Sequence, residues 1–139
     1  MFSLFKPKQK QPKSLGQAGE EYAQREYKKQ GWKIVAANEF NRTGKRLGEI
    51  DFIAKNKEKI VFVEVKSRTD FSETFGSGAE AVNVHKQQKI LRAVKAYLLK
   101  NQKYLALQPQ IDVCVVRCGG VDKTPYSATI LANAVEDWG

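Results

Sequence analysis

The chain has 139 residues, 42% of them hydrophobic, and a formal net charge of +9. This length predicts one domain with its own hydrophobic core. No segment approaches the ~18 consecutive apolar residues of a membrane span, and the N-terminus lacks the apolar core of a signal peptide, so we expect a cytoplasmic protein without membrane contact. The excess of basic over acidic residues favours a nucleic-acid partner, although an ordinary solvated basic surface accounts for this excess equally well.

Composition separates a tail from the domain. Residues 1–13 are rich in lysine, glutamine and proline and contain no acid, which predicts a basic, disordered tail. Residues 14–139 are then a single folded domain. The two cysteines, Cys114 and Cys118, have no companion pair, so neither a zinc set nor a disulfide framework is expected. Cys114 lies in an apolar run and is expected in the core.

The first expected element is a helix that starts at Ser14. Gln17 follows three residues later, as in a capping box. The helix should continue to about Gln30 and stop at Gly31. A stripe of small residues along it would let another element approach closely: Gly16, Gly19 and Ala23.

Strands and one further helix follow. Pro109 is expected to break the pattern before the last long strand. The order predicts an α/β fold with a mixed sheet, in which a three-stranded meander is joined by a helical crossover to a strand parallel to one of its members. The expected segments are a strand at 32–39, a basic turn at 41–46, strands at about 47–54 and 59–67, a polar loop at 67–78, a helix at 79–100, a strand at 111–116 and an edge strand at 128–131.

Charged residues interrupt the most apolar of these strands. Glu64 and Lys66 lie two residues apart in an otherwise apolar run, so both side chains project from the same face. Burial of such charges is costly unless they are paired or bind a metal. Asp51 lies in the preceding strand, and a hairpin over 55–59 would place the two strands side by side. Two carboxylates and an ammonium group should therefore meet at one point.

This cluster has the chemistry of metal-assisted phosphodiester hydrolysis. Carboxylates bind Mg²⁺ or Mn²⁺ through oxygen, and the ion activates both phosphate and water. Lys66 would position the nucleophilic water or stabilise the pentacoordinate phosphate. The structural alternative is a buried ion-pair network, but such networks add little stability over apolar packing. Glu49 shares the face of Asp51, and it would either support the site or anchor Arg42 or Lys45.

The motifs resemble those of a known family. They fall in the order of the bacterial YraN family across about residues 14–137, and that family is similar to restriction-endonuclease-like domains related to archaeal Holliday-junction resolvases. The resemblance implies a three-layer fold with a mixed central sheet flanked by helices. The matching motifs are Gly19-Glu20, Gly31-Trp32, Gly48-Glu-Ile-Asp51, Val61-Phe-Val-Glu-Val-Lys66, Phe75-Gly76, His85-Lys86 and Ile111-Asp-Val113.

The resemblance also implies site residues. Metal ligands would be Glu20, Asp51 and Glu64, and Lys66 would be the catalytic lysine. Glu21 is the rival of Glu20, but the family's Gly-Glu pair matches Gly19-Glu20. The chain departs from the family near its end, where Ile130-Leu-Ala-Asn-Ala134 lacks the usual histidine.

We therefore expect a Mg²⁺- or Mn²⁺-dependent DNA nuclease acting on branched or otherwise structured DNA. The alternatives are a nucleic-acid-binding module that does not cleave and a structural or protein-interaction domain. His85, the only histidine, is left outside the expected site. A junction-resolving role would favour a two-fold homodimer. Residues expected to contact the phosphate backbone are Arg42, Lys45, Arg46, Arg68 and Lys86.

Overall fold

The computed structural model describes residues 13–37, 50–69 and 84–135. Their helices and strands follow the α-β-β-β-α-β order expected from the sequence, and the last strand includes the expected edge strand at 128–131. The expected tail, the basic turn 41–46, most of the loop 67–78 and the start of the second helix lie outside the described residues. The elements are α1 (Leu15–Lys29), β1 (Lys33–Ala37), β2 (Phe52–Lys55), β3 (Lys59–Thr69), α2 (Val84–Lys100), the short 3₁₀ helix η2 (Gln102–Tyr104), β4 (Gln108–Cys118) and β5 (Pro125–Leu131).

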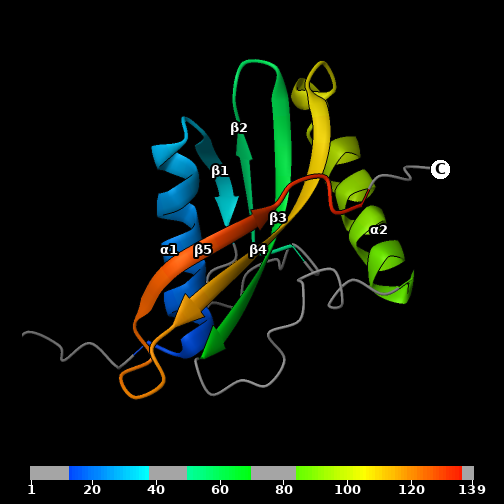
Figure 1. Ribbon diagram of the computed structural model, residues 1–139. Helices are drawn as coiled ribbons and strands as arrows, with labels where there is room; N and C mark the ends of the chain where they lie inside the picture. Colours follow the sequence, from blue (N-terminus) through cyan, green and yellow to red (C-terminus); the bar gives the residue numbers. More distant parts are fainter. Residues whose placement is uncertain (1–12, 38–49, 70–83, 136–139) are drawn as a thin grey trace, which may run out of the picture.

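The strands form one mixed sheet in the order β1-β2-β3-β4-β5. β1, β2 and β3 are antiparallel neighbours, as a meander requires. β4 is parallel to β3, and β5 is antiparallel to β4. A parallel neighbour needs a long crossover connection, which α2 provides. The expected mixed topology is confirmed (Figure 1).

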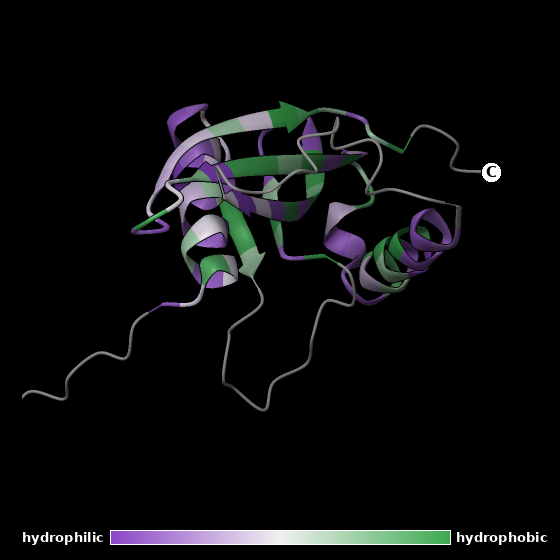
Figure 2. Ribbon diagram, turned by 60° about the horizontal axis from the view of Figure 1, so that its bottom comes forward, coloured by the Kyte–Doolittle hydropathy of each residue, from purple (hydrophilic) through white to green (hydrophobic). Residues whose placement is uncertain are grey.

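The two helices cover opposite faces of the sheet, so the domain has three layers (Figure 1). Hydrophobic residues are concentrated in the strands between the helices, whose surfaces carry many hydrophilic residues (Figure 2). Cys114 is buried in the α1-side core, as expected. No helix in the described ranges is long and apolar enough to cross a membrane. The main core residues are Ala23, Tyr27, Phe52, Val61, Val63 and Val116 on the α1 side, and Ile53, Ile60, Phe62, Ile90, Val94, Ile111 and Val113 on the α2 side.

Local sequence explains both ends of α1. The Gln17 amide donates to Ser14 Oγ over 3.1 Å, and the Ser14 amide donates to Gln17 Oε1 over 3.0 Å. This is the expected capping box, which satisfies two helix-end donors. At the other end Gly31 has a φ of 94°, a left-handed conformation that favours glycine. Both predicted boundaries of the helix are confirmed.

Pro109 lies inside β4 and does not precede it, which corrects the expected start of that strand. It occupies the second position of β4 and is the parallel partner of Ile60. β4 pairs with β5 from Val113 onwards, so Pro109 lies in the part of β4 that pairs only with β3. Proline is tolerated in a strand where one side makes no ladder bond.

Gly19 allows α1 to lie against the end of β3. A Cβ atom at position 19 would be 1.8 Å from Ser67 Oγ and 3.0 Å from Ser67 Cβ. The close approach expected from the small-residue stripe is therefore confirmed at this position. The expectation is wrong at Gly16, which is exposed and whose added Cβ would have only Ser14 Oγ nearby, at 3.9 Å.

The two glycines should respond in opposite ways to alanine. Gly19→Ala should destabilise the fold by about 1–3 kcal/mol, because helix and strand must move apart. Gly16→Ala should stabilise it by about 0.5–1 kcal/mol, because alanine favours the helix and meets no obstacle. Urea denaturation of both variants measures the two changes. Equal stability of the two variants would contradict the close approach at Gly19.

Candidate active site

Glu64 and Lys66 meet on the α2-facing side of β3. Their side chains project from one face, as their spacing predicted, and Lys66 Nζ lies 3.1 Å from Glu64 Oε1. The Glu64 residue is only 5% exposed. A carboxylate so far from water requires compensating charge. The lysine two residues further along the strand provides part of it.

Lys86 provides the rest from the start of α2. Its Nζ lies 2.6 Å from the same oxygen, Glu64 Oε1. The sequence suggested either a phosphate contact or a solvated side chain for Lys86. In the structure the side chain is instead half-buried and paired with Glu64. Two ammonium groups thus share one carboxylate oxygen.

Asp51 reaches the cluster at the start of the β2–β3 hairpin. The turn is fixed by Asn56, whose Oδ1 accepts from the amides of Glu58 at 2.9 Å and Lys59 at 2.7 Å. Asp51 lies just before the first residue of β2, and its Oδ2 accepts from the Val65 amide over 2.7 Å. The pairing of β2 with β3 ends at Phe52 and Val63, so the Asp51 side chain provides a hydrogen-bond acceptor for the Val65 amide just beyond it. This bond fixes the carboxylate beside Glu64.

Glu20 approaches from α1, the layer on the opposite side of the sheet. Its carboxylate is close enough to Asp51 for a direct electrostatic interaction. The residue is 3% exposed, and Oε1 has no hydrogen-bond partner in the described structure. The neighbouring Glu21 is partly exposed and pairs with Lys13. Of the two rivals, Glu20 is therefore the one that lies with the other acids.

The shared environment alters the pKa values of these groups. Burial, reinforced by Asp51 and Glu21, raises the pKa of Glu20 to about 8. Burial also raises the pKa of Asp51 to about 6; the Val65 amide and the two lysines oppose this rise, and Glu64 adds to it. Burial and the contact with Lys86 lower the pKa of Lys66 against the opposing effect of Glu64. Groups with such shifts are common in functional sites.

Asp51 interacts electrostatically with both of the other acids, Glu20 and Glu64. Among the described residues no three acidic, histidine or cysteine side chains form a ready-made metal cage. Glu20 Oε1 and Glu64 Oε2 are nevertheless buried without a partner. Unsatisfied buried oxygens require an explanation, such as water, an ion or a catalytic role.

Asp112 provides an internal comparison. It is 2% exposed, but its Oδ2 accepts from Tyr27 Oη over 2.6 Å. Its Oδ1 accepts from Gln110 Nε2 at 2.8 Å and from the Asn133 amide at 3.1 Å. This carboxylate links α1, β4 and the segment after β5, with both oxygens satisfied. Sequence reasoning assigned it no role, although it interrupts an apolar strand just as Glu64 does.

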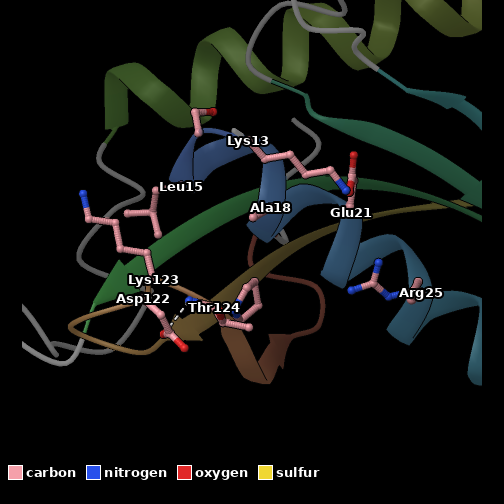
Figure 3. Close-up of a pocket in the computed structure, with 10 residues that line it drawn as sticks. Lys13, Leu15, Ala18, Glu21, Arg25, Asp122, Lys123 and Thr124 are labelled. Carbon is pink, nitrogen blue, oxygen red and sulfur yellow. Dashed lines mark hydrogen bonds and ion pairs between the residues drawn. The ribbon is translucent and has the colours of Figure 1, made fainter. Parts of the chain in front are cut away.

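A separate pocket lies at the N-terminal end of α1, beside the β4–β5 turn (Figure 3). Both acids that line it have partners: Glu21 pairs with Lys13, and Asp122 Oδ1 accepts from the Thr124 amide at 3.0 Å. Glu20, Asp51 and Glu64 do not line it. The described structure therefore places the unsatisfied acidic chemistry at the sheet, away from this pocket.

The remaining expected contact residues are only partly described. Arg68 follows Lys66 on the same face of β3, and its Nη1 donates to the Ser67 carbonyl oxygen over 3.0 Å. Arg42, Lys45, Arg46 and Glu49 lie outside the described residues. His85 is exposed at the start of α2.

The layers and the element order are compatible with a three-layer, nuclease-like α/β fold. Residues 19–116 match the family described as "Uncharacterised protein family UPF0102". The chain belongs to this family, which is the YraN group whose motifs the sequence resembles.

Individual relatives match over most of their length. A UPF0102 protein of Caldanaerobacter subterraneus is 42% identical over 104 residues, which cover 75% of this chain and 80% of the relative. A UPF0102 protein of Clostridium botulinum is 36% identical over 124 residues, which cover 89% of this chain and 95% of the relative. A UPF0102 protein of a Synechococcus species is 32% identical over 134 residues, which cover 95% of this chain and 98% of the relative.

The raised pKa of Glu20 should make stability fall as the pH rises. Unfolding returns the pKa of Glu20 from about 8 to its ordinary value of 4.5, so the folded protein holds the proton of the Glu20 carboxyl group more tightly than the unfolded chain does. The stabilisation is complete below the unfolded pKa and is lost as the pH rises through the folded pKa. Glu20→Gln should escape this loss, and its advantage over the wild type should grow between about pH 5 and pH 8, by up to a few kcal/mol.

Urea denaturation in EDTA buffers measures this difference. Glu58→Gln, at an exposed acid of the β2–β3 turn, is the matched control. A difference between Glu20→Gln and the wild type that stays constant with pH would contradict the assignment.

Proposed function

We propose that this protein is a Mg²⁺- or Mn²⁺-dependent DNA nuclease, with branched or structured DNA as substrate. The observation that carries the proposal is the pair of buried, unsatisfied carboxylate oxygens, Glu20 Oε1 and Glu64 Oε2, in two residues that both interact electrostatically with Asp51. Membership of this family does not by itself indicate an activity, because the description of the family names none. The proposal therefore depends on the chemistry of these side chains.

The donor set fits a hard divalent cation. Asp51 and Glu64 would hold the ion through oxygen, and Glu20 would be an auxiliary ligand. Mg²⁺ commonly binds through one or two carboxylates and keeps several waters, so it does not need a complete protein cage. The described site residues offer no thiolate or imidazole that would favour zinc. When bound, such an ion polarises the phosphodiester and makes water a better nucleophile.

Lys66 is the residue best placed to act on the reacting groups. Its ammonium group lies 3.1 Å from Glu64 Oε1, so it would be next to a phosphate held at the acids. There it would either orient the attacking water or stabilise charge on the phosphate. Burial and Lys86 lower the pKa of Lys66, which eases its exchange of a proton with that water.

A nucleic-acid-binding module without cleavage is the second candidate. The observation in its favour is that Lys66 and Lys86 already balance the charge of Glu64 without a metal. Divalent-ion dependence distinguishes the two functions. A nuclease needs the ion and Glu64, whereas a module would bind DNA equally well in EDTA or with Glu64→Gln.

Lys66→Met should lower DNA cleavage by about 100-fold or more, the usual contribution of a positioned acid or base. The fold should remain intact, because methionine fills a similar volume and Lys86 still pairs with Glu64 Oε1. Cleavage is measured on a panel of linear, flap and four-way-junction DNAs with Mg²⁺ and with Mn²⁺.

The control for this experiment is Lys57→Met, at an exposed lysine of the β2–β3 turn. Thermal melts of both variants separate lost chemistry from lost folding. Cleavage by Lys66→Met at close to the wild-type rate would remove Lys66 from the mechanism. A wild-type protein that cuts none of the panel would contradict the proposed activity itself.

Lys86 should compete with the metal for Glu64. Lys86→Met removes one of two ammonium groups from Glu64 Oε1, so Mn²⁺ should bind several-fold more tightly. Glu64→Gln should weaken Mn²⁺ binding by tenfold or more, because a ligand charge is lost. Isothermal titration calorimetry measures both affinities. If Glu64→Gln binds Mn²⁺ as tightly as the wild type, the metal assignment is wrong.

A further inference from the structure

The crossover segment of the chain carries cations and no acid. Between Glu80 and Asp112 the sequence contains five lysines and one arginine but neither aspartate nor glutamate. Most of the described part of this segment is α2 (Val84–Lys100). Solvent-exposed helices are commonly stabilised by charges of opposite sign that pair along one face. The one-sided charge of α2 instead favours an anionic partner.

Four of these cations recur at every third residue of α2. Residues three apart are neighbours on a helix, with Cβ atoms about 5–6 Å apart, and successive steps of three form an inclined ridge. The ridge begins beside the acidic cluster, because the Nζ of its first member, Lys86, lies 2.6 Å from Glu64 Oε1. The members of this basic ridge are Lys86, Lys89, Arg92 and Lys95.

The last three cations of the ridge lie on the exposed side of the helix. Lys89, Arg92 and Lys95 are exposed, and none of them forms an ion pair within the described part of the chain. Like charges at this spacing repel each other and destabilise the helix. An anion bound along the ridge would relieve this repulsion.

The surface beside the ridge is hollowed. The hollow has a volume of about 250 Å³, and the described residues that line it are Gln88, Leu91, Arg92 and Lys95. The side chains of Gln88, Arg92 and Lys95 carry hydrogen-bond donors, which phosphate oxygens accept. Leu91, which packs against the α2-side core, adds an apolar surface that a sugar ring can contact. The hollow thus has the chemistry for one unit of a sugar–phosphate chain.

We propose that the basic ridge binds the sugar–phosphate backbone of one nucleic-acid strand and leads that strand away from the acidic cluster. The inference rests on the proposed function, which places a phosphodiester at Glu64. From Lys86 to Lys95 the helix advances about 13.5 Å, the length of about four nucleotides of one duplex strand. Contacts to the backbone position the strand without reading its sequence.

Salt-dependent DNA binding by the whole protein tests the ridge without any need for cleavage. Fluorescence anisotropy in EDTA gives the affinity for a labelled duplex and for a labelled single strand at several salt concentrations. Arg92→Gln and Lys95→Gln each remove one charge and introduce a good helix former. Each should weaken binding about three- to tenfold at low salt. Each should also lower the slope of log affinity against log salt by about 0.9 for duplex or 0.7 for single strand, which corresponds to one lost contact.

Lys100→Gln is the matched control. Lys100 is an exposed lysine of the same helix, but it lies outside the three-residue spacing of the ridge. Its replacement changes the net charge by the same amount and should leave affinity and slope close to those of the wild type. Thermal melts without nucleic acid check the fold. The two ridge variants should melt at or above the wild-type temperature, because each loses a repulsive neighbour.

The ridge is overturned if Arg92→Gln and Lys95→Gln behave like Lys100→Gln, or if the wild type binds neither oligonucleotide at low salt. Binding through these two residues to vesicles of phosphatidylserine and phosphatidylcholine, but not to the oligonucleotides, would also overturn it, because the partner would then be a membrane surface. A protein that binds DNA through the ridge but never cleaves with Mg²⁺ or Mn²⁺ would support the ridge and overturn the nuclease activity. A protein that cleaves DNA, while neither ridge variant weakens binding, would do the reverse.

Discussion

The arrangement of the site depends on one buried carboxylate. Glu64 projects from the central strand of the sheet, and it is 5% exposed. The lysine two residues further on and the lysine at the start of α2 both pair with its Oε1. Its other oxygen has no partner in the described structure. The charge of Glu64 thus links the start of α2 to the sheet through Lys86, while one oxygen of the carboxylate keeps no hydrogen-bond partner among the described residues.

Burial of a carboxylate does not by itself identify a functional site, as Asp112 demonstrates. Asp112 is as deeply buried as Glu64, but three donors satisfy its two oxygens. It links elements from both ends of the chain and has the character of a structural group. Glu20 and Glu64 are buried without that complement of donors. The distinction lies in hydrogen-bond satisfaction, which the structure reveals and an amino-acid pattern does not.

Much of the fold and the centre of the site could be predicted from the sequence. Strand periodicity placed Glu64 and Lys66 on one face, and the short connection after Lys55 made the hairpin with Asp51 predictable. Both ends of α1 followed from local capping chemistry. Such inferences succeed because they depend on residues close together in the chain or on a strict period.

Contacts between distant segments were harder to predict. The ion pair between Lys86 and Glu64 depends on where α2 packs, whereas the sequence suggested a phosphate contact or a solvated side chain for Lys86. The alignment of Arg68 with Arg117 depends on the register of a parallel pair, which no local motif specifies. Asp112 carried a usable signal, since it interrupts an apolar strand, but its donors come from α1 and from the segment after β5.

The parallel pairing of β3 and β4 imposes an order on folding. The hairpin of β2 and β3 brings Asp51 and Glu64 together through local contacts, whereas β4 can join only after the chain has crossed the sheet through α2. Non-local pairing of this kind is slow. Until α2 docks, the hairpin holds its two acids with Lys66 but without Lys86. Docking of α2 buries an apolar face of the sheet and also brings Lys86 to Glu64, so the packing of the crossover helix and the charge compensation of Glu64 depend on each other.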